Sequence, residues 1–96
     1  MGTSKYYTKM KNVHNALSDV VDMYTANTLE YDVIHHSPEQ RLWIVNVYNR
    51  DAPGSLLQVE VIDNNGVPLC CVLQKINVGR RSMSKFMNRL VDALDT

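Results

Sequence analysis

Hydrophobic and polar positions follow two different periods along this chain. Between Met10 and Tyr24, and again from about Ser82 to Leu94, the apolar side chains recur at helical spacing while polar side chains fill the other side. Each pattern predicts an amphipathic helix that buries one apolar stripe. Ser82 is the expected N-cap of the second helix, because a serine side chain accepts hydrogen bonds from the free amides at a helix start.

Four segments between these helices show the period of two that is typical of strands. They are residues 29–36, 41–49, 56–62 and 67–76. Apolar and polar side chains alternate in them, and β-branched and aromatic residues are frequent. Turn-forming residues separate the segments, with Pro38 after the first and Gly54 after the second. Asn64-Asn65-Gly66 is a typical hairpin turn between the third and fourth.

The short connections decide how these strands pair. A parallel crossover needs about a dozen residues or more, so neighbouring strands must run antiparallel. Two helices with one apolar stripe each then pack on one face of a four-stranded antiparallel meander. The predicted fold class is α+β, in the order helix-strand-strand-strand-strand-helix. A chain of 96 residues forms one domain, which we place at residues 10–96, with residues 1–9 as a tag or disordered lead.

Packing both helices on one face leaves the other face of the sheet open. Leu42, Ile44, Leu56 and Ile62 are predicted to lie on this open face. Trp43 has two interpretations, because it is either the core anchor of the second strand or an interaction residue on the open face. An apolar open face would offer a surface to a partner or to another domain of the same protein.

The charges are unevenly distributed, although the formal net charge is +0 and the composition is that of a globular domain. Residues 64–91 contain five basic residues and no acidic one. Arg81, Lys85 and Arg89 recur at every fourth residue and therefore share one face of the second helix. Arg80 and Lys75 lie just upstream. The second half of the chain therefore carries a concentrated positive edge.

These five basic residues, Lys75, Arg80, Arg81, Lys85 and Arg89, form the candidate anion-binding or lipid-binding site. Cations in the first turn oppose the helix dipole, at a cost of a few tenths to about 1 kcal/mol. Free amides at the helix start, together with cationic side chains, would hold a phosphate group. The alternative interpretation is a solvated charged face that flanks the core. Each basic side chain would contribute about 1 kcal/mol to the free energy of binding to an anionic membrane. Binding to nucleic acid would instead weaken steeply with rising salt concentration.

Other chemistry finds little support in the sequence. His35-His36 and Cys70-Cys71 are adjacent pairs, and adjacent strand residues point to opposite faces, so we predict no metal site. Cys71 is expected in the core and Cys70 on the opposite face. Without a Gly-rich phosphate loop or an oriented Cys-His pair, we predict no catalytic residue, no enzyme activity and no cofactor. The cysteine usage, with no signal peptide or transmembrane segment in the sequence, favours a cytoplasmic setting.

The segment 57–79 and the helix after it carry a family resemblance. An acidic-apolar strand containing Glu60 leads through a turn to an apolar strand that ends in Lys75-Ile76 and Gly79, and Phe86 of the following helix faces the sheet. With the predicted element order, this pattern resembles the kinase-associated-1 domain. That domain is a small regulatory module at the C-terminus of microtubule-affinity-regulating and septin-associated protein kinases. The pattern also resembles the C-terminal domain of the catalytic subunit of AMP-activated protein kinase.

The resemblance implies a non-catalytic C-terminal regulatory domain of a serine/threonine protein kinase. Such a domain binds anionic phospholipid, restrains its own kinase domain by autoinhibition, or docks a partner subunit. It also implies a cytoplasmic protein that associates peripherally with the inner membrane surface. The basic lipid-binding positions of the family cluster near the start of the last helix and the preceding strand, which matches Lys75, Arg80, Arg81, Lys85 and Arg89. Many members begin with a strand before the first helix, where this chain offers only residues 5–8.

Two other interpretations stay open. Double-stranded-RNA-binding domains run helix, three strands, helix, and the segment 79–85 is faintly similar to the basic start of their last helix. The fourth strand and the turn at residues 36–39 depart from that pattern, so a nucleic-acid partner ranks below a membrane or protein partner. The other interpretation is a protein-protein interaction module that uses the open sheet face.

Overall fold

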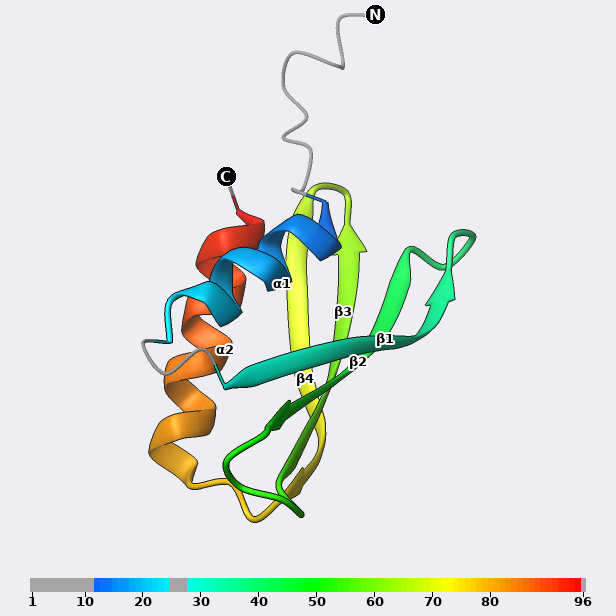
Figure 1. Cartoon of the computed structure of the whole chain (residues 1–96). Coiled ribbons are helices and arrows are strands. Elements are labelled where there is room, and N and C mark those ends of the chain that lie inside the picture. The colour runs from blue at the N-terminus through cyan, green and yellow to red at the C-terminus, as the bar shows by residue number, and fades with distance from the viewer. Residues whose placement is uncertain (1–11, 25–27, 96) are drawn as a thin grey trace, which may run out of the picture.

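The structure of the chain is a computed structural model that describes residues 12–24 and 28–95. Its elements, in chain order, are α1 (Val13–Asp22), β1 (Leu29–Ser37), β2 (Leu42–Asn49), β3 (Leu56–Asn64), β4 (Val67–Ile76) and α2 (Arg80–Leu94) (Figure 1). The strands form one antiparallel sheet in the order β1-β2-β3-β4. The predicted α+β class and element order are confirmed. The expected lead at residues 1–9 lies outside the described residues.

The core lies between one face of the sheet and the two helices. Alternate residues of the central strands are buried, namely Val45, Val47, Leu57, Val59 and Val61. The apolar stripes of the helices meet them with Val13, Ala16, Leu17, Val20, Phe86, Leu90 and Leu94. Burying one such large apolar side chain contributes about 1.5–3 kcal/mol. Because the buried strand residues project from one side only, the prediction of a single covered face is also confirmed.

The N-terminus of α1 is set by Asn12. Its Oδ1 accepts hydrogen bonds from the backbone amides of His14 at 2.9 Å and Asn15 at 3.3 Å. An asparagine at this position satisfies amides that have no partner within the helix. The predicted helix, from Met10 to Tyr24, is therefore too long within the described residues, where α1 ends at Asp22. Met10 lies outside them.

The start of α2 differs from the prediction. The helix begins at Arg80, Gly79 is the N-cap, and Ser82 lies inside the first turn. The prediction that Ser82 is the N-cap of this helix was therefore wrong. Upstream of the cap, Asn77 adopts a left-handed φ of 51° and half-buried Val78 packs against the core. Because Val78 anchors the chain at this point, the helix can begin directly after Gly79.

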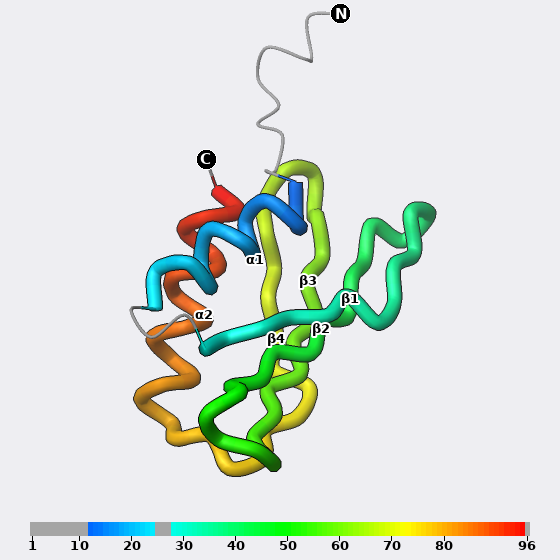
Figure 2. Tube along the Cα trace, viewed as in Figure 1, coloured from blue at the N-terminus to red at the C-terminus, as the bar shows by residue number. Residues whose placement is uncertain are grey.

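A bulge in β1 alters the β1–β2 hairpin. The register shifts between Val33 and His35, so Ile34 is the extra residue on β1. Beyond the bulge, His36 lies opposite Trp43 and their rings stack with centroids 4.8 Å apart. Trp43 pairs with buried Val61 in the β2–β3 register and packs against the core. It therefore belongs to the helix-bearing face. The turn end of the β1–β2 hairpin extends away from both helices (Figure 2).

The open face of the sheet carries the residues predicted for it. Leu42 lies opposite Ile62, while Ile44 and Leu56 alternate with buried residues of the same strands. Leu69 of β4, opposite Ile62, extends the apolar row and is 48% exposed. The placement of Leu42, Ile44, Leu56 and Ile62 is confirmed, and all of them are half-buried by their neighbours.

The assignment of the two cysteines was reversed. Cys70 lies opposite buried Val61 and packs against the core, whereas Cys71 lies opposite Glu60 and is exposed. The register follows from the β3–β4 turn, where Asn65 and Gly66 both have positive φ, at 54° and 86°. Such two-residue turns are typical of tight hairpins and place Asn64 opposite Val67. Cys70 therefore shares the face of Val61.

Candidate anion-binding site

Four of the five predicted cations lie on α2. Each helical residue advances about 100° around the axis, so Arg81, Lys85 and Arg89 form one row, which we call the α2 cation row. Arg81 and Lys85 are exposed on the side of the helix opposite the buried stripe. Arg89 is half-buried and lies closer to that stripe. Arg80 is exposed but lies about 100° around the axis from Arg81. The helix therefore brings three of the cations together and turns Arg80 to another side.

Arg89 is held beside the core by an aromatic ring. Its Cζ lies 5.2 Å from the centroid of the Tyr24 ring, and this ring lies 6.5 Å from that of Phe86. A guanidinium over an aromatic face at this distance gains about 0.5–1 kcal/mol at an exposed site. No local sequence pattern predicts the contact between Arg89 and Tyr24, because Tyr24 follows α1 and Arg89 lies on α2, far away in the chain.

Lys75 approaches α2 from the sheet. It is exposed near the end of β4 and lies directly opposite Leu57 in the β3–β4 register. Opposite residues in an antiparallel pair project from the same face. Because Leu57 faces the core, Lys75 belongs to the helix-bearing face. Because Lys75 lies on β4, it is not a member of the α2 cation row.

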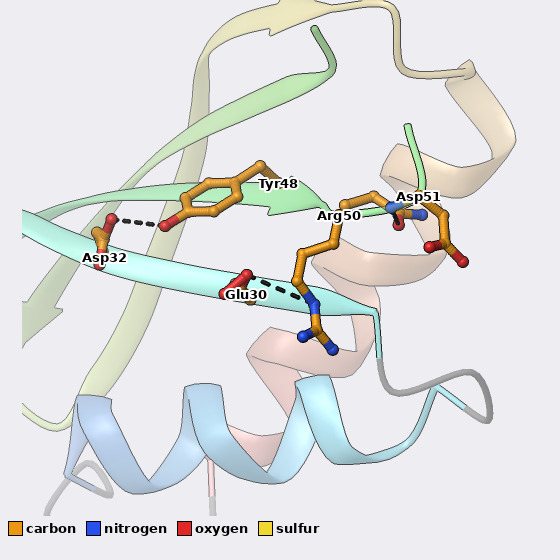
Figure 3. Close-up of polar contacts among 6 residues, drawn as sticks. Glu30, Asp32, Tyr48, Arg50 and Asp51 are labelled. Carbon is orange, nitrogen blue, oxygen red and sulfur yellow. Dashed lines mark hydrogen bonds and ion pairs between the residues drawn. The ribbon is translucent and has the colours of Figure 1, made fainter. Parts of the chain in front are cut away.

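The five cations have no carboxylate partner within the described residues 12–24 and 28–95, where none of them forms an ion pair. Two of the acidic side chains, Glu30 and Asp32 on β1, have other partners (Figure 3). Arg50 Nε lies 3.6 Å from Glu30 Oε1, and the Tyr48 hydroxyl donates a hydrogen bond of 2.7 Å to Asp32 Oδ2. This hydrogen bond raises the pKa of Tyr48 above its ordinary value, with burial and the charges of Asp32 and Glu30 adding to the effect. Within the described residues, these five cations are therefore not paired with carboxylates.

The N-terminus of α2 has no side-chain cap. The first intrahelical hydrogen bond runs from the Met83 amide to the Gly79 carbonyl at 2.9 Å. The preceding amides have no carbonyl partner within the helix, as at any helix start. A Cβ added at Gly79 would meet nothing within 4 Å, and its φ of −67° suits any residue. The start of this helix is therefore sterically open and electrostatically positive.

A cavity of about 430 Å³ lies beside this helix start, between the ends of the strands and α2. Buried Val47, Leu57 and Phe86 form its floor. Its remaining lining comes from Tyr24, Thr28, Leu29, Tyr48, Asn49, Ala52, Ser55, Asn77, Val78, Gly79 and Ser82. No local pattern in the sequence marks this cavity, because its lining comes from segments far apart in the chain.

Thiols and imidazoles also occur in the part of the chain that the structure describes. No group of three or more metal-ligating side chains occurs there. Partial burial raises the pKa of the Cys70 thiol to about 11, so at neutral pH it is protonated and a poor nucleophile. His35 and His36 face opposite sides of the sheet, opposite Ile44 and Trp43 respectively.

No described helix is both long and apolar enough to pass through a bilayer. A comparison of the chain with protein-family models, curated proteins and solved structures found no match. The geometry of the site therefore carries the functional argument, together with the family resemblance of the segment 57–79.

Proposed function

We propose that this chain is a non-catalytic binding module that holds anionic phospholipid headgroups on the α2 cation row. The observation that carries this proposal is the combination of charge and exposure on α2. Arg81 and Lys85 are exposed, Arg89 continues the row, and no acidic residue precedes Asp92 on the helix. Unpaired cations near a helix N-terminus are unfavourable unless an anion is present.

The geometry of the row suits a membrane surface. A straight row of side chains on one side of a helix can contact a flat layer of headgroups at several points. Each basic side chain close to an anionic membrane contributes about 1 kcal/mol, so three to five of them give reversible binding. The uncapped start of α2 adds amide donors at one end of the row.

The kinase context of this proposal comes from the resemblance to the kinase-associated-1 domain. The order helix, four strands, helix supports it, because the resemblance depends on that element order. The module would then regulate a serine/threonine protein kinase in the cytoplasm, at the inner membrane surface or by contact with the kinase domain. We expect the native gene to encode a kinase domain upstream of this segment. A native gene without one would remove this part of the proposal and leave the lipid-binding part standing.

Co-sedimentation with phosphatidylserine vesicles tests the lipid-binding proposal. The variant Arg81→Gln/Lys85→Gln removes two exposed cations of the row. We expect its partitioning onto vesicles to fall by about 2 kcal/mol, or roughly 30-fold. The matched control is Arg41→Gln/Arg50→Gln, which removes the same charge from the turn before β2 and the residue after it. This control should bind like the wild type.

Equal losses in the two variants would show that net charge alone drives binding and would contradict a specific cation row. Unchanged pelleting of Arg81→Gln/Lys85→Gln would reject the row. A salt-dependent gel shift with duplex RNA, without vesicle binding, would instead favour the RNA-binding alternative.

A further inference from the structure

The cavity beside the start of α2 has no role in the binding mode proposed above. The α2 cation row can contact a membrane without it. The cavity is nevertheless large for a domain of 96 residues, at about 430 Å³. This volume falls within the range of roughly 300–1,000 Å³ that is typical of small-molecule sites. Its lining therefore indicates which ligand it could hold.

The lining of the cavity combines buried apolar residues with exposed polar residues. Val47, Leu57 and Phe86 at the floor are at most 5% exposed and belong to the core. Asn77 and Ser82 supply amide and hydroxyl groups, and no charged residue of the described chain lines the cavity. An apolar chain in contact with this floor would lose little hydration of polar groups. The buried apolar floor, among lining residues that carry no charge, favours a ligand with an apolar body.

Cations lie at two sides of the cavity. Lys75 is the cross-strand neighbour of Leu57, which forms part of the floor. The guanidinium of Arg89 covers the ring of Tyr24, which lines a wall. Among the described residues no acidic side chain lines the cavity, and none occurs in the sequence between residues 64 and 91. Glu30 is the cross-strand neighbour of the lining residue Tyr48, and Asp32 accepts the hydrogen bond of the Tyr48 hydroxyl. The cations on the Lys75 side of the cavity therefore complement an anionic head attached to an apolar body, whereas acidic groups lie on the Tyr48 side.

We propose that this cavity binds the alkyl chain of an anionic amphiphile, with the charged head near Lys75 and the polar rim. The inference rests on the proposed function for the charge of the ligand and on the cavity for its apolar part. The same chemistry occurs in a free alkyl phosphate or fatty acid and in a phospholipid of a membrane. The two sources differ in whether a bilayer is needed for binding.

Binding of monomeric alkyl phosphates tests this inference without a membrane. Butyl, hexyl and octyl phosphate are titrated below their micelle concentrations and followed by amide NMR. Each additional buried methylene should tighten binding by about fourfold, from about 0.8 kcal/mol per methylene. The amide signals of Asn77, Gly79 and Ser82 should shift on binding.

A pair of serine variants on the same helix provides the steric test. Ser82→Leu places a larger side chain into the cavity, whereas Ser84→Leu adds the same side chain at an exposed position that does not line it. We expect Ser82→Leu to weaken octyl phosphate binding at least tenfold and Ser84→Leu to change it less than twofold. Thermal unfolding of the two variants shows whether both remain folded.

The outcomes separate this inference from the proposed function. Affinity that does not rise with chain length, or Ser82→Leu that binds octyl phosphate as the wild type does, would overturn the cavity inference. If vesicle binding is unchanged in such a case, the proposal that the α2 cation row binds phospholipid headgroups still stands. Octyl phosphate binding without vesicle binding would support the cavity with a free amphiphile as its ligand and reject the membrane.

Discussion

Cys70 and Cys71 are chemically identical neighbours whose surroundings differ because of strand alternation. Cys70 faces the core opposite Val61, and Cys71 faces solvent opposite Glu60. Partial burial raises the pKa of the Cys70 thiol to about 11 from the ordinary 9.0, since a thiolate loses hydration there. The neutral thiol therefore favours the folded state below about pH 9, and this contribution is lost as the pH rises through about 11.

Alkylation kinetics should distinguish the two thiols. At pH 8 we expect a maleimide to label Cys71 rapidly and Cys70 slowly, because the thiolate is the reactive form and Cys70 holds its proton. Cys71→Ser should abolish the fast phase, and Cys70→Ser should abolish the slow phase. Labelling followed by mass spectrometry measures both. Equal rates for the two cysteines in the folded protein would contradict the observed register.

The helix α2 combines two roles at the scale of an element. Its buried side, with Phe86, Leu90 and Leu94, holds the helix to the sheet. Its exposed side carries the α2 cation row, and its N-cap is a glycine without a side-chain acceptor. A stronger cap was sterically available, since a Cβ at Gly79 would meet nothing within 4 Å. An uncapped start lowers helix stability slightly and keeps the positive end of the helix open to an anion.

Substitutions at Gly79 separate these two effects. Gly79→Asn and Gly79→Asp both introduce a capping oxygen, and both should stabilise the fold by about 0.5–1 kcal/mol, measured by thermal unfolding. Only Gly79→Asp adds a negative charge. We expect it to weaken binding to phosphatidylserine vesicles by several-fold, while Gly79→Asn changes binding less. If both variants bind equally well, the start of α2 does not lie near the bound anion.

At the scale of the whole molecule, one core joins all the elements. The two helices contact each other, α1 also contacts β1, and α2 also contacts β4. Charged side chains are spread over separate elements, with Glu30 and Asp32 on β1 and, on α2, cations that form no ion pair with any described residue. A small domain is stabilised by only about 5–15 kcal/mol and usually unfolds as one unit. Loss of one buried contact should therefore lower the free energy of unfolding of the helices and the sheet together.

Leu90→Ala tests this single core. Leu90 is 0% exposed, and its truncation should lower the free energy of unfolding by about 2–5 kcal/mol. Asn88→Ala on the exposed side of the same helix should have little effect. Circular dichroism reports on the helices, and fluorescence of Trp43 reports on the β1–β2 hairpin. Two separate transitions by these probes would show that the hairpin and the helices do not unfold together.

Local rules predicted which cations share a helix face but not where the other cations lie. The spacing of Arg81, Lys85 and Arg89 was sufficient to place them in one row, because helical geometry is local. The same rule did not place Arg80, because the predicted helix began at about Ser82 whereas α2 begins at Arg80, and it does not apply to Lys75 on the sheet. The two-residue turn at Asn65 and Gly66 could have predicted that Cys70 faces the core. The contact of Arg89 with Tyr24 had no local signal.

The amino-acid sequence alone determined the order of helices and strands, the antiparallel sheet, the face that the helices cover and the position of the cationic segment. These properties follow from periodicity, connection length and composition, which act over a few neighbouring residues. Tertiary packing decided the helix start at Gly79, the bulge at Ile34, the partner of Arg89 and the cavity beside α2. Each depends on how segments distant in the chain fill shared space, and the pattern of any one segment does not contain that information.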